Sequence, residues 1–311
     1  MTQDMIFLPR GPQSVLDSIA IYCRQRPQLK EILETFQPIF EKRASLAEKF
    51  SSMELHDIPA LDFGRWNMEN QGISILAGVP LSFLAAWLNI SLQEMLPLLQ
   101  ANMPNGQELE KVNKAFEQGK LNPVTCLETL IAGDLPGMKR FAEKTNCSES
   151  VLYFACSMIA SPALEALTGP ILQQVPELFW KEGFCPVCGS FPSIAVLSRP
   201  EKTALESLIG GGGKKFLHCS LCGHEWYFRR DTCPACQNAE PGTKEIFYAS
   251  KAKQERIEVC SRCKTYLPCI DLREYSQDPN PFVAPVGLLH LNIIAAEKGC
   301  APLAPAPWNT F

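Results

Sequence analysis

The sequence lacks several features that would place it in a specialised class of protein. Its 311 residues carry 29 Lys and Arg against 33 Asp and Glu, so no charge excess indicates nucleic acid or an anionic membrane as a partner. No uninterrupted apolar run reaches the ~18 residues that a membrane span requires, and the first residues do not resemble an export signal. We therefore expect a cytoplasmic protein without membrane insertion.

Motifs for common cofactors and for catalysis are also missing. No flavin or nicotinamide fingerprint is present, and no pairing of carboxylates, or of Cys with His, has a catalytic pattern. The glycine run at 210–213 lacks the spacing of a phosphate-binding loop, and Lys214 is not followed by Ser or Thr. We interpret the run as a flexible loop between two strands, and we expect that the protein is not an enzyme.

Strand-like alternation is absent from residues 1–180, where helix-forming residues dominate and Pro or Gly interrupts them. The tetrapeptide Ser91-Leu92-Gln93-Glu94 has the form of a capping box, which predicts that a helix begins there. This part carries 14 basic and 20 acidic side chains. The pattern therefore predicts an acidic helical domain.

Cysteine, by contrast, is abundant, with 14 residues in the chain. Eight of them form four Cys-x-x-Cys pairs: Cys185 and Cys188, Cys219 and Cys222, Cys233 and Cys236, and Cys260 and Cys263. Without an export signal, metal binding is favoured over a disulfide framework. Thiolates at this spacing point at one ion, and the tight turn between them lets backbone N–H groups donate to sulfur. Four pairs therefore predict two four-sulfur metal sites.

The order of the pairs predicts which of them share an ion. Thirty residues separate Cys188 from Cys219, and 23 separate Cys236 from Cys260, so each gap has room for two antiparallel strands. Joining the second pair to the third leaves only ten residues between them and makes the outer pairs span the whole region. We therefore favour sequential pairing. Strands are expected at 193–197, 215–218, 225–228, 245–248 and 256–259.

Together these patterns predict an α+β fold. We expect a helical domain at 1–180, a first rubredoxin-like or zinc-ribbon module at 181–224, a second at 225–275, and a C-terminal helix with a Pro-rich tail at 276–311. Each module is too small to bury a core of its own, so its metal would supply folding energy. Zinc and iron both accept four thiolates in a tetrahedron, and spacing alone leaves both open.

Other residues near the cysteine pairs have simpler interpretations. His218 and His224 flank the second pair, but eight cysteines already fill two sites, so we expect both histidines to be structural. Trp226–Phe228 is expected to pack the module core rather than to stack on bases. Cys269 is expected to be an inert thiol.

The stretches FCPVCGSFPSIAV, FLHCSLCGHEWYFRRDTCPACQN and IEVCSRCKTYLPCIDLRE resemble the FdhE family, the formate dehydrogenase accessory proteins. The strong resemblance covers about 184–273. It implies a soluble cytoplasmic maturation factor, or chaperone, that binds the catalytic subunit of a formate dehydrogenase. It also implies two rubredoxin-like sites, which favours iron over zinc for the two ions. It does not assign the residues that contact the partner.

A zinc-ribbon that binds nucleic acid, or another protein-interaction module, is the alternative. Residues 181–275 hold 14 Lys and Arg against 11 Asp and Glu, a difference of +3. Two Zn(Cys)₄ sites would bring this charge to about −1, and two ferric sites to about +1, and neither supplies the basic field that phosphates require. Electron transfer by ferric and ferrous centres is a third hypothesis. We prefer the hypothesis of an accessory protein that catalyses no reaction of its own.

Overall fold

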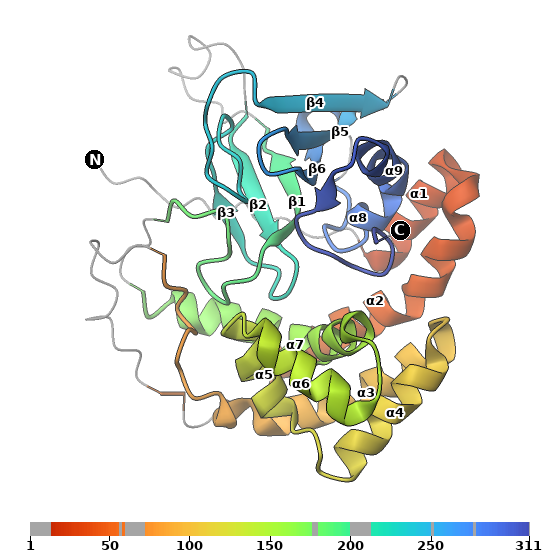
Figure 1. Cartoon of the computed structure of the whole chain (residues 1–311), viewed down its shortest axis with the longest axis vertical. Coiled ribbons are helices and arrows are strands. Elements are labelled where there is room, and N and C mark those ends of the chain that lie inside the picture. Colours follow the sequence, from red (N-terminus) through yellow and green to blue (C-terminus); the bar gives the residue numbers. More distant parts are fainter. Residues whose placement is uncertain are drawn as a thin grey trace.

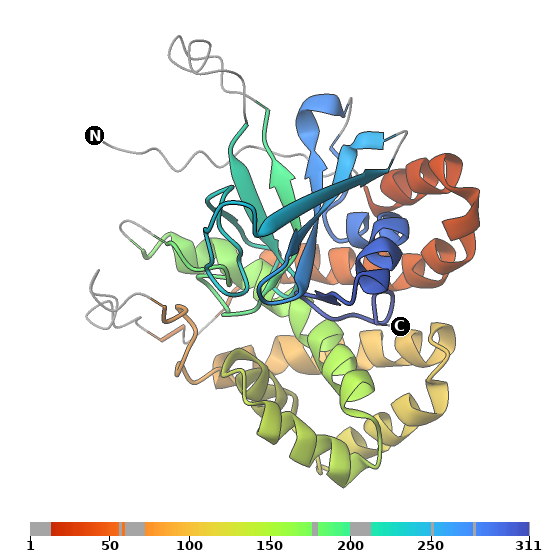
Figure 2. The same ribbon diagram turned by 45° about the horizontal axis from the view of Figure 1, so that its top comes forward.

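The computed structural model describes residues 14–55, 58–59, 72–175, 180–199, 213–249, 252–275 and 278–310. A helical part from the first half of the chain lies against a β-sheet part from the second half (Figures 1 and 2). This is the mixed α+β arrangement that the sequence predicts. The glycines at 210–212 lie outside the described residues, and the division into four domains stays a prediction.

The helical part is built around one long helix, α7, which contacts five of the other helices. The described helices of this part are α1 (Val15–Gln25), α2 (Lys30–Ser51), α3 (Ala85–Asn102), α4 (Gly106–Glu117), α5 (Pro123–Ile131), α6 (Leu135–Thr145) and α7 (Glu149–Leu172), with single 3₁₀ turns at Pro27–Leu29 and Ser82–Leu84.

Helix α7 is central because apolar residues occupy its whole circumference. Its length and composition would let it cross a membrane, but 67% of its most apolar stretch is buried inside the protein. Helix α3 approaches it closely, since the hydroxyl of Ser91 donates to the carbonyl oxygen of Ile159 at 2.6 Å. The predicted capping box is therefore wrong: α3 begins at Ala85, and Ser91 is a buried residue of its interior.

The β part forms a single mixed sheet in the order β3-β2-β1-β6-β5-β4, and β7 pairs with one end of β6. The strands are β1 (Pro192–Leu197), β2 (Lys215–Cys219), β3 (Glu225–Tyr227), β4 (Lys244–Ala249), β5 (Ala252–Cys260), β6 (Thr265–Asp271) and β7 (Ala301–Pro302). The pairs β1–β2, β2–β3, β4–β5 and β5–β6 are antiparallel, whereas β1 and β6 run parallel with Ala195 opposite Cys269. Two three-stranded units are thus joined edge to edge.

All five expected strands are present with ends no more than four residues from the predicted ones, but β6 and the two-residue β7 were not predicted. The sequence of β6, TYLPCID, carries Pro268 in the middle and is buried on both faces, so it shows no alternation of apolar and polar residues. The strand that joins the two units was therefore missed because its burial hides the period-two signal.

The C-terminal segment connects the two parts of the molecule. Helix α8 (Ala284–Gly287) contacts α1, α2 and β1, and α9 (Leu289–Glu297) packs on β4, β5 and β6. In the Pro-rich tail, the buried Trp308 lies edge-on to Phe36 of α2, with ring centroids 5.0 Å apart. The end of the chain therefore docks on the helical part.

Candidate metal centres

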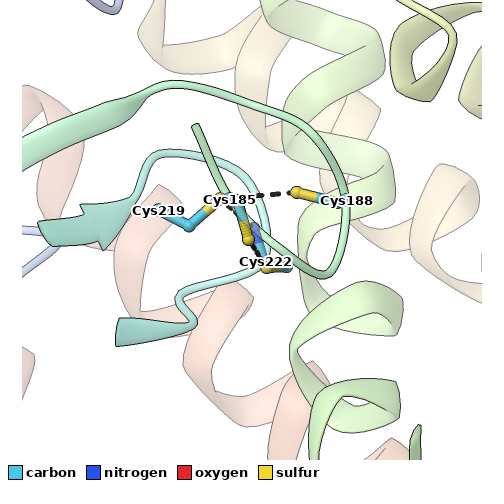
Figure 3. Close-up of side chains that lie close together, drawn as sticks. All are labelled: Cys185, Cys188, Cys219 and Cys222. Carbon is cyan, nitrogen blue, oxygen red and sulfur yellow. Dashed lines mark hydrogen bonds between the residues drawn. The ribbon is translucent and has the colours of Figure 1, made fainter. Parts of the chain in front are cut away.

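The first cysteine group combines the turn before β1 with the turn between β2 and β3. Cys185 and Cys222 have sulfur atoms 3.5 Å apart, and the sulfurs of Cys188 and Cys219 are 3.4 Å apart. All four sulfurs lie within 4.8 Å of one another and face a common centre (Figure 3). None of the four residues is more than 1% exposed. We call this group the enclosed site.

Its backbone turns explain why each pair converges. In the second turn the N–H groups of Leu221 and Cys222 both donate to the sulfur of Cys219 at 3.4 Å. The residue after each pair, Gly189 or Gly223, has a left-handed backbone with φ of +79° or +71°. Glycine adopts this conformation without strain, so it lets the chain reverse directly after the second cysteine.

The helical part covers the enclosed site on its own side. The N–H groups of Ile75 and Leu76 donate to the carbonyl oxygens of Pro186 and Val187 at 2.7 and 3.0 Å, so the segment before α3 pairs with the first turn. A Cβ atom at Gly189 would lie 3.1 Å from the hydroxyl oxygen of Ser74. The site therefore lies between the sheet and the helices.

Arg43 of α2 links the helices to the second turn of the enclosed site. Its Nε donates to the hydroxyl of Ser161 in α7 at 2.7 Å, and that hydroxyl donates to the carbonyl oxygen of Leu221 at 2.6 Å. The guanidinium also lies 3.1 Å from the ring centroid of Phe282 and pairs with Glu165 at 2.8 Å. Burial lowers the pKa of Arg43, while Glu165 and the thiols of Cys222 and Cys219 favour its charge. It is therefore a buried cation beside the cysteine group.

Without a cation two of the enclosed thiols would resist ionisation. Burial raises the pKa of Cys185 and of Cys222 well above the ordinary thiol value, and contacts with Cys188 and Cys219 raise both further. Burial also opposes ionisation of Cys188, but hydrogen bonds from the other three thiols hold its pKa well below the ordinary value. Burial also lowers the pKa of His224 to about 4, so this imidazole is neutral. A bound metal ion reverses the balance for the thiols, because it stabilises thiolates directly.

The second cysteine group combines the loop before β4 with the turn between β5 and β6. The sulfurs of Cys233 and Cys263 are 3.7 Å apart, those of Cys236 and Cys260 are 3.8 Å apart, and all four lie within 4.8 Å. Cys233 and Cys260 are buried, Cys263 is half-buried and Cys236 is exposed. We call this group the open site.

Both groups have spacings that fit a tetrahedral metal ion. With metal–sulfur bonds of about 2.3 Å, neighbouring sulfurs lie roughly 3.8 Å apart. The four sulfur–sulfur distances given above, 3.4 to 3.8 Å, are close to this value and far from the ~2.05 Å of a disulfide. Each group can therefore hold one ion, and the cysteines assemble in the sequential order expected from the chain. A four-thiolate tetrahedron accepts zinc and iron alike.

The neighbouring residues lie mostly where the sequence places them. His218 packs edge-on to the ring of Phe282 at 4.6 Å between centroids, and neither His218 nor His224 belongs to a cysteine group. Trp226 and Phe228 are buried core residues, but Tyr227 is 54% exposed because side chains alternate along β3. Cys269 is buried in β6, where desolvation raises its pKa to about 11.

The sequence reasoning missed Arg43, although a signal for it was present. Arg43 lies four residues after Ile39 and three before Leu46, on the buried stripe of α2. A charged residue on an apolar helical stripe indicates a polar partner inside the protein, here the buried Ser161, which in turn bonds to the second turn of the enclosed site. The contact from residues 75–76 left no such signal, because it uses backbone groups alone.

Comparison with known proteins gives matches along nearly the whole chain. No protein-family model matches it. The chain is 23% identical over 297 residues to a protein FdhE homolog of Aquifex aeolicus, covering 94% of both sequences. A protein FdhE homolog of Shewanella oneidensis is 33% identical over 86 residues, or 28% of this chain and 25% of that protein. The fold is that of the FdhE protein from Pseudomonas aeruginosa, whose crystal structure matches with a TM-score of 0.65 at 20% identity over 94% of this chain and 93% of that one.

Proposed function

Because the chain resembles the FdhE family along nearly its whole length, in sequence and in fold, we propose that it is a formate dehydrogenase accessory protein that docks on the catalytic subunit of such an enzyme during maturation. The observation that carries this proposal is the full-length match combined with two four-cysteine groups. The protein acts in the cytoplasm and turns over no substrate of its own.

The eight paired cysteines are the proposed ligands of two metal ions, with iron favoured because the resemblance is to proteins with rubredoxin-like sites. In such a site the ion adds folding energy and fixes the turns that carry its ligands. Both groups already supply four sulfurs, so neither leaves a ligand position for substrate. This closed ligand set supports binding rather than catalysis.

The metal content of the purified protein tests the ligand assignment. Protein prepared without oxygen should contain close to two metal ions per chain, and iron should give a red colour from sulfur-to-metal absorption. Zinc protein would lack that colour. If elemental analysis found one ion or none in carefully prepared protein, at least one of the two proposed ligand sets would be wrong.

The client is tested by capture and by deletion in the native host. An anaerobic pull-down with the full chain should recover a formate dehydrogenase catalytic subunit, and a deletion strain should lose formate dehydrogenase activity. The variant Tyr227→Ser changes an exposed residue that belongs to neither cysteine group, and it serves as a control for general surface effects in the pull-down. Unchanged activity in the deletion strain, with no dehydrogenase captured, would rule out this client and leave the metal sites untouched.

A further inference from the structure

The two cysteine groups offer different access to an incoming ligand. In the enclosed site no cysteine is more than 1% exposed, whereas in the open site Cys236 faces solvent and Cys263 is half-buried. Metal exchange between ligands proceeds through contact of the new donor with the ion, so a path from solvent is the first requirement. Only the open site has such a path in the described part of the chain.

The attachments of the two sites also differ. At the enclosed site the first turn is bonded to residues 75–76 and the second to Ser161 of α7, so both turns are fixed by the helical part. Opening it would separate the sheet from the helices, which requires breaking much of the buried core.

The open site is held on one side by the sheet and on the other by a loop. Cys260 and Cys263 lie at the turn between β5 and β6, where Cys260 is the last residue of the ladder and is paired with Thr265 on one side and Lys244 on the other. The side chain of Asn238 holds the loop that carries Cys233 and Cys236. Its Nδ2 donates to the hydroxyl of Thr243 at 2.6 Å, and its Oδ1 accepts from Arg262 at 3.2 Å. The loop also lies against the segment before Cys185, where the Gln237 amide donates to Glu182 and Pro234 packs on Gly183. None of these contacts belongs to the strand ladder, so the loop can open while the sheet stays folded.

From this asymmetry we propose that the open site is an exchangeable metal site with Cys236 as its leaving ligand, while the enclosed site retains its metal. In exchange, a donor atom of the competing ligand bonds to the ion as the bond to the Cys236 sulfur breaks, and the released thiolate takes a proton from water. The protein then has a two-metal form and a one-metal form that differ at the loop 229–243. The inference rests on the proposed ligand set and is independent of the client.

Release of metal to a chelator tests this asymmetry on the full-length protein with zinc at both sites. With a coloured zinc chelator in excess, we expect two phases of one equivalent each, the first at least on the order of tenfold faster, since local opening costs less than global opening. Alkylation followed by peptide mass analysis should modify Cys236 and Cys263 in the fast phase, before any cysteine of the enclosed site.

Two variants assign the phases. Cys236→Ser should abolish the fast, full-equivalent phase and keep the slow one, whereas Cys23→Ser, which lies outside both groups, should leave both phases unchanged. Two equivalents released in a single phase, or early alkylation of Cys185 or Cys188, would overturn the inference while the ligand assignment stood. Purified protein with no metal at these cysteines would instead overturn the ligand assignment itself.

Discussion

The two halves of the β-sheet follow one plan in different surroundings. In each half a cysteine pair precedes a strand, a second strand follows, and the next pair leads into a third strand: β1, β2 and β3 in the first half, β4, β5 and β6 in the second. The first half is covered by the helices and the second faces solvent at its cysteine group. The plan sets the ligand geometry, and the surroundings decide how tightly the ligands are held.

The type of residue that follows each cysteine pair differs between the two halves of the sheet. All four have a left-handed backbone, with φ of +79° at Gly189, +71° at Gly223, +56° at Gln237 and +57° at Lys264. At Gly223 a Cβ atom would lie 2.8 Å from the Phe282 ring, so only glycine fits. Gln237 and Lys264 are exposed, and the Gln237 side chain extends to a surface hydrogen bond with Glu182. Packing, and not the turn itself, therefore requires glycine in the first half.

Loss of one ligand in each half should give the largest contrast. Cys219→Ser removes a ligand of the enclosed site and leaves polar groups buried between sheet and helices, so we expect loss of several kcal/mol and poor recovery of folded protein. Cys236→Ser removes an exposed ligand on a loop that opens apart from the sheet, so the loss should be clearly smaller, on the order of 1 to 2 kcal/mol. Thermal unfolding with metal analysis measures both. Equal destabilisation by the two variants would break the comparison.

Removal of the Arg43 charge should also destabilise the protein strongly. Arg43→Met leaves the buried hydroxyl of Ser161 without its donor and the partly exposed Glu165 without its cation, so we expect a loss of about 1 to 3 kcal/mol in free energy of unfolding. The matched control is Arg229→Met, since Arg229 pairs with Asp231 on the surface and should matter by no more than about 0.5 kcal/mol. Denaturant unfolding gives both values. An Arg43 variant as stable as the control would show that the helices do not brace the enclosed site through this residue.

Substitution after the cysteine pairs gives a smaller, more local contrast. Gly223→Ala places a methyl group against the Phe282 ring and in a left-handed backbone, so it should cost about 1 to 3 kcal/mol. Gln237→Ala keeps the same backbone strain without a buried neighbour, and stability should stay within about 0.5 kcal/mol of the natural protein. Chemical unfolding of both variants with metal bound tests this. If Gln237→Ala proved as costly, packing against Phe282 would not be what distinguishes the two turns.

The sequence predicts the site better than it predicts the sheet. The cysteine spacing determines both groups because the ligands of each pair are local and the gaps between pairs are short. The pairing of β1 with β6 joins segments about 70 residues apart, and no local pattern carries that information. The repeated plan does contain a signal for β6. Strand β3 follows the pair at Cys219 and Cys222, so a strand is also expected after the pair at Cys260 and Cys263, where β6 lies.

The last prediction concerns stability in acid. His290, which belongs to neither cysteine group, contributes to it, and its effect must be removed before the two sites can be compared. Burial and the charge of Arg26 lower the pKa of His290 in α9 to about 4, while an unfolded histidine titrates near 6.5. Between these values the unfolded chain binds more protons, so stability falls as the pH decreases from about 6.5 to about 4. The contribution is on the order of 1 to 3 kcal/mol at the acid end and vanishes above pH 6.5.

His290→Gln should remove this slope and leave the other groups in place. Glu255, whose carboxylate lies 3.8 Å from the His290 Nε2 atom, has a pKa raised by burial and contributes with the opposite sign, but it is present in both proteins. Unfolding by denaturant at pH 7, 5.5 and 4.5 should therefore give curves that diverge toward acid, with the variant losing less stability. The acid sensitivity that remains in the variant should come from release of metal. The open site should release its ion at a higher pH than the enclosed site, because water reaches Cys236 and Cys263. Parallel profiles for the two proteins would place the acid sensitivity in the cysteine groups alone.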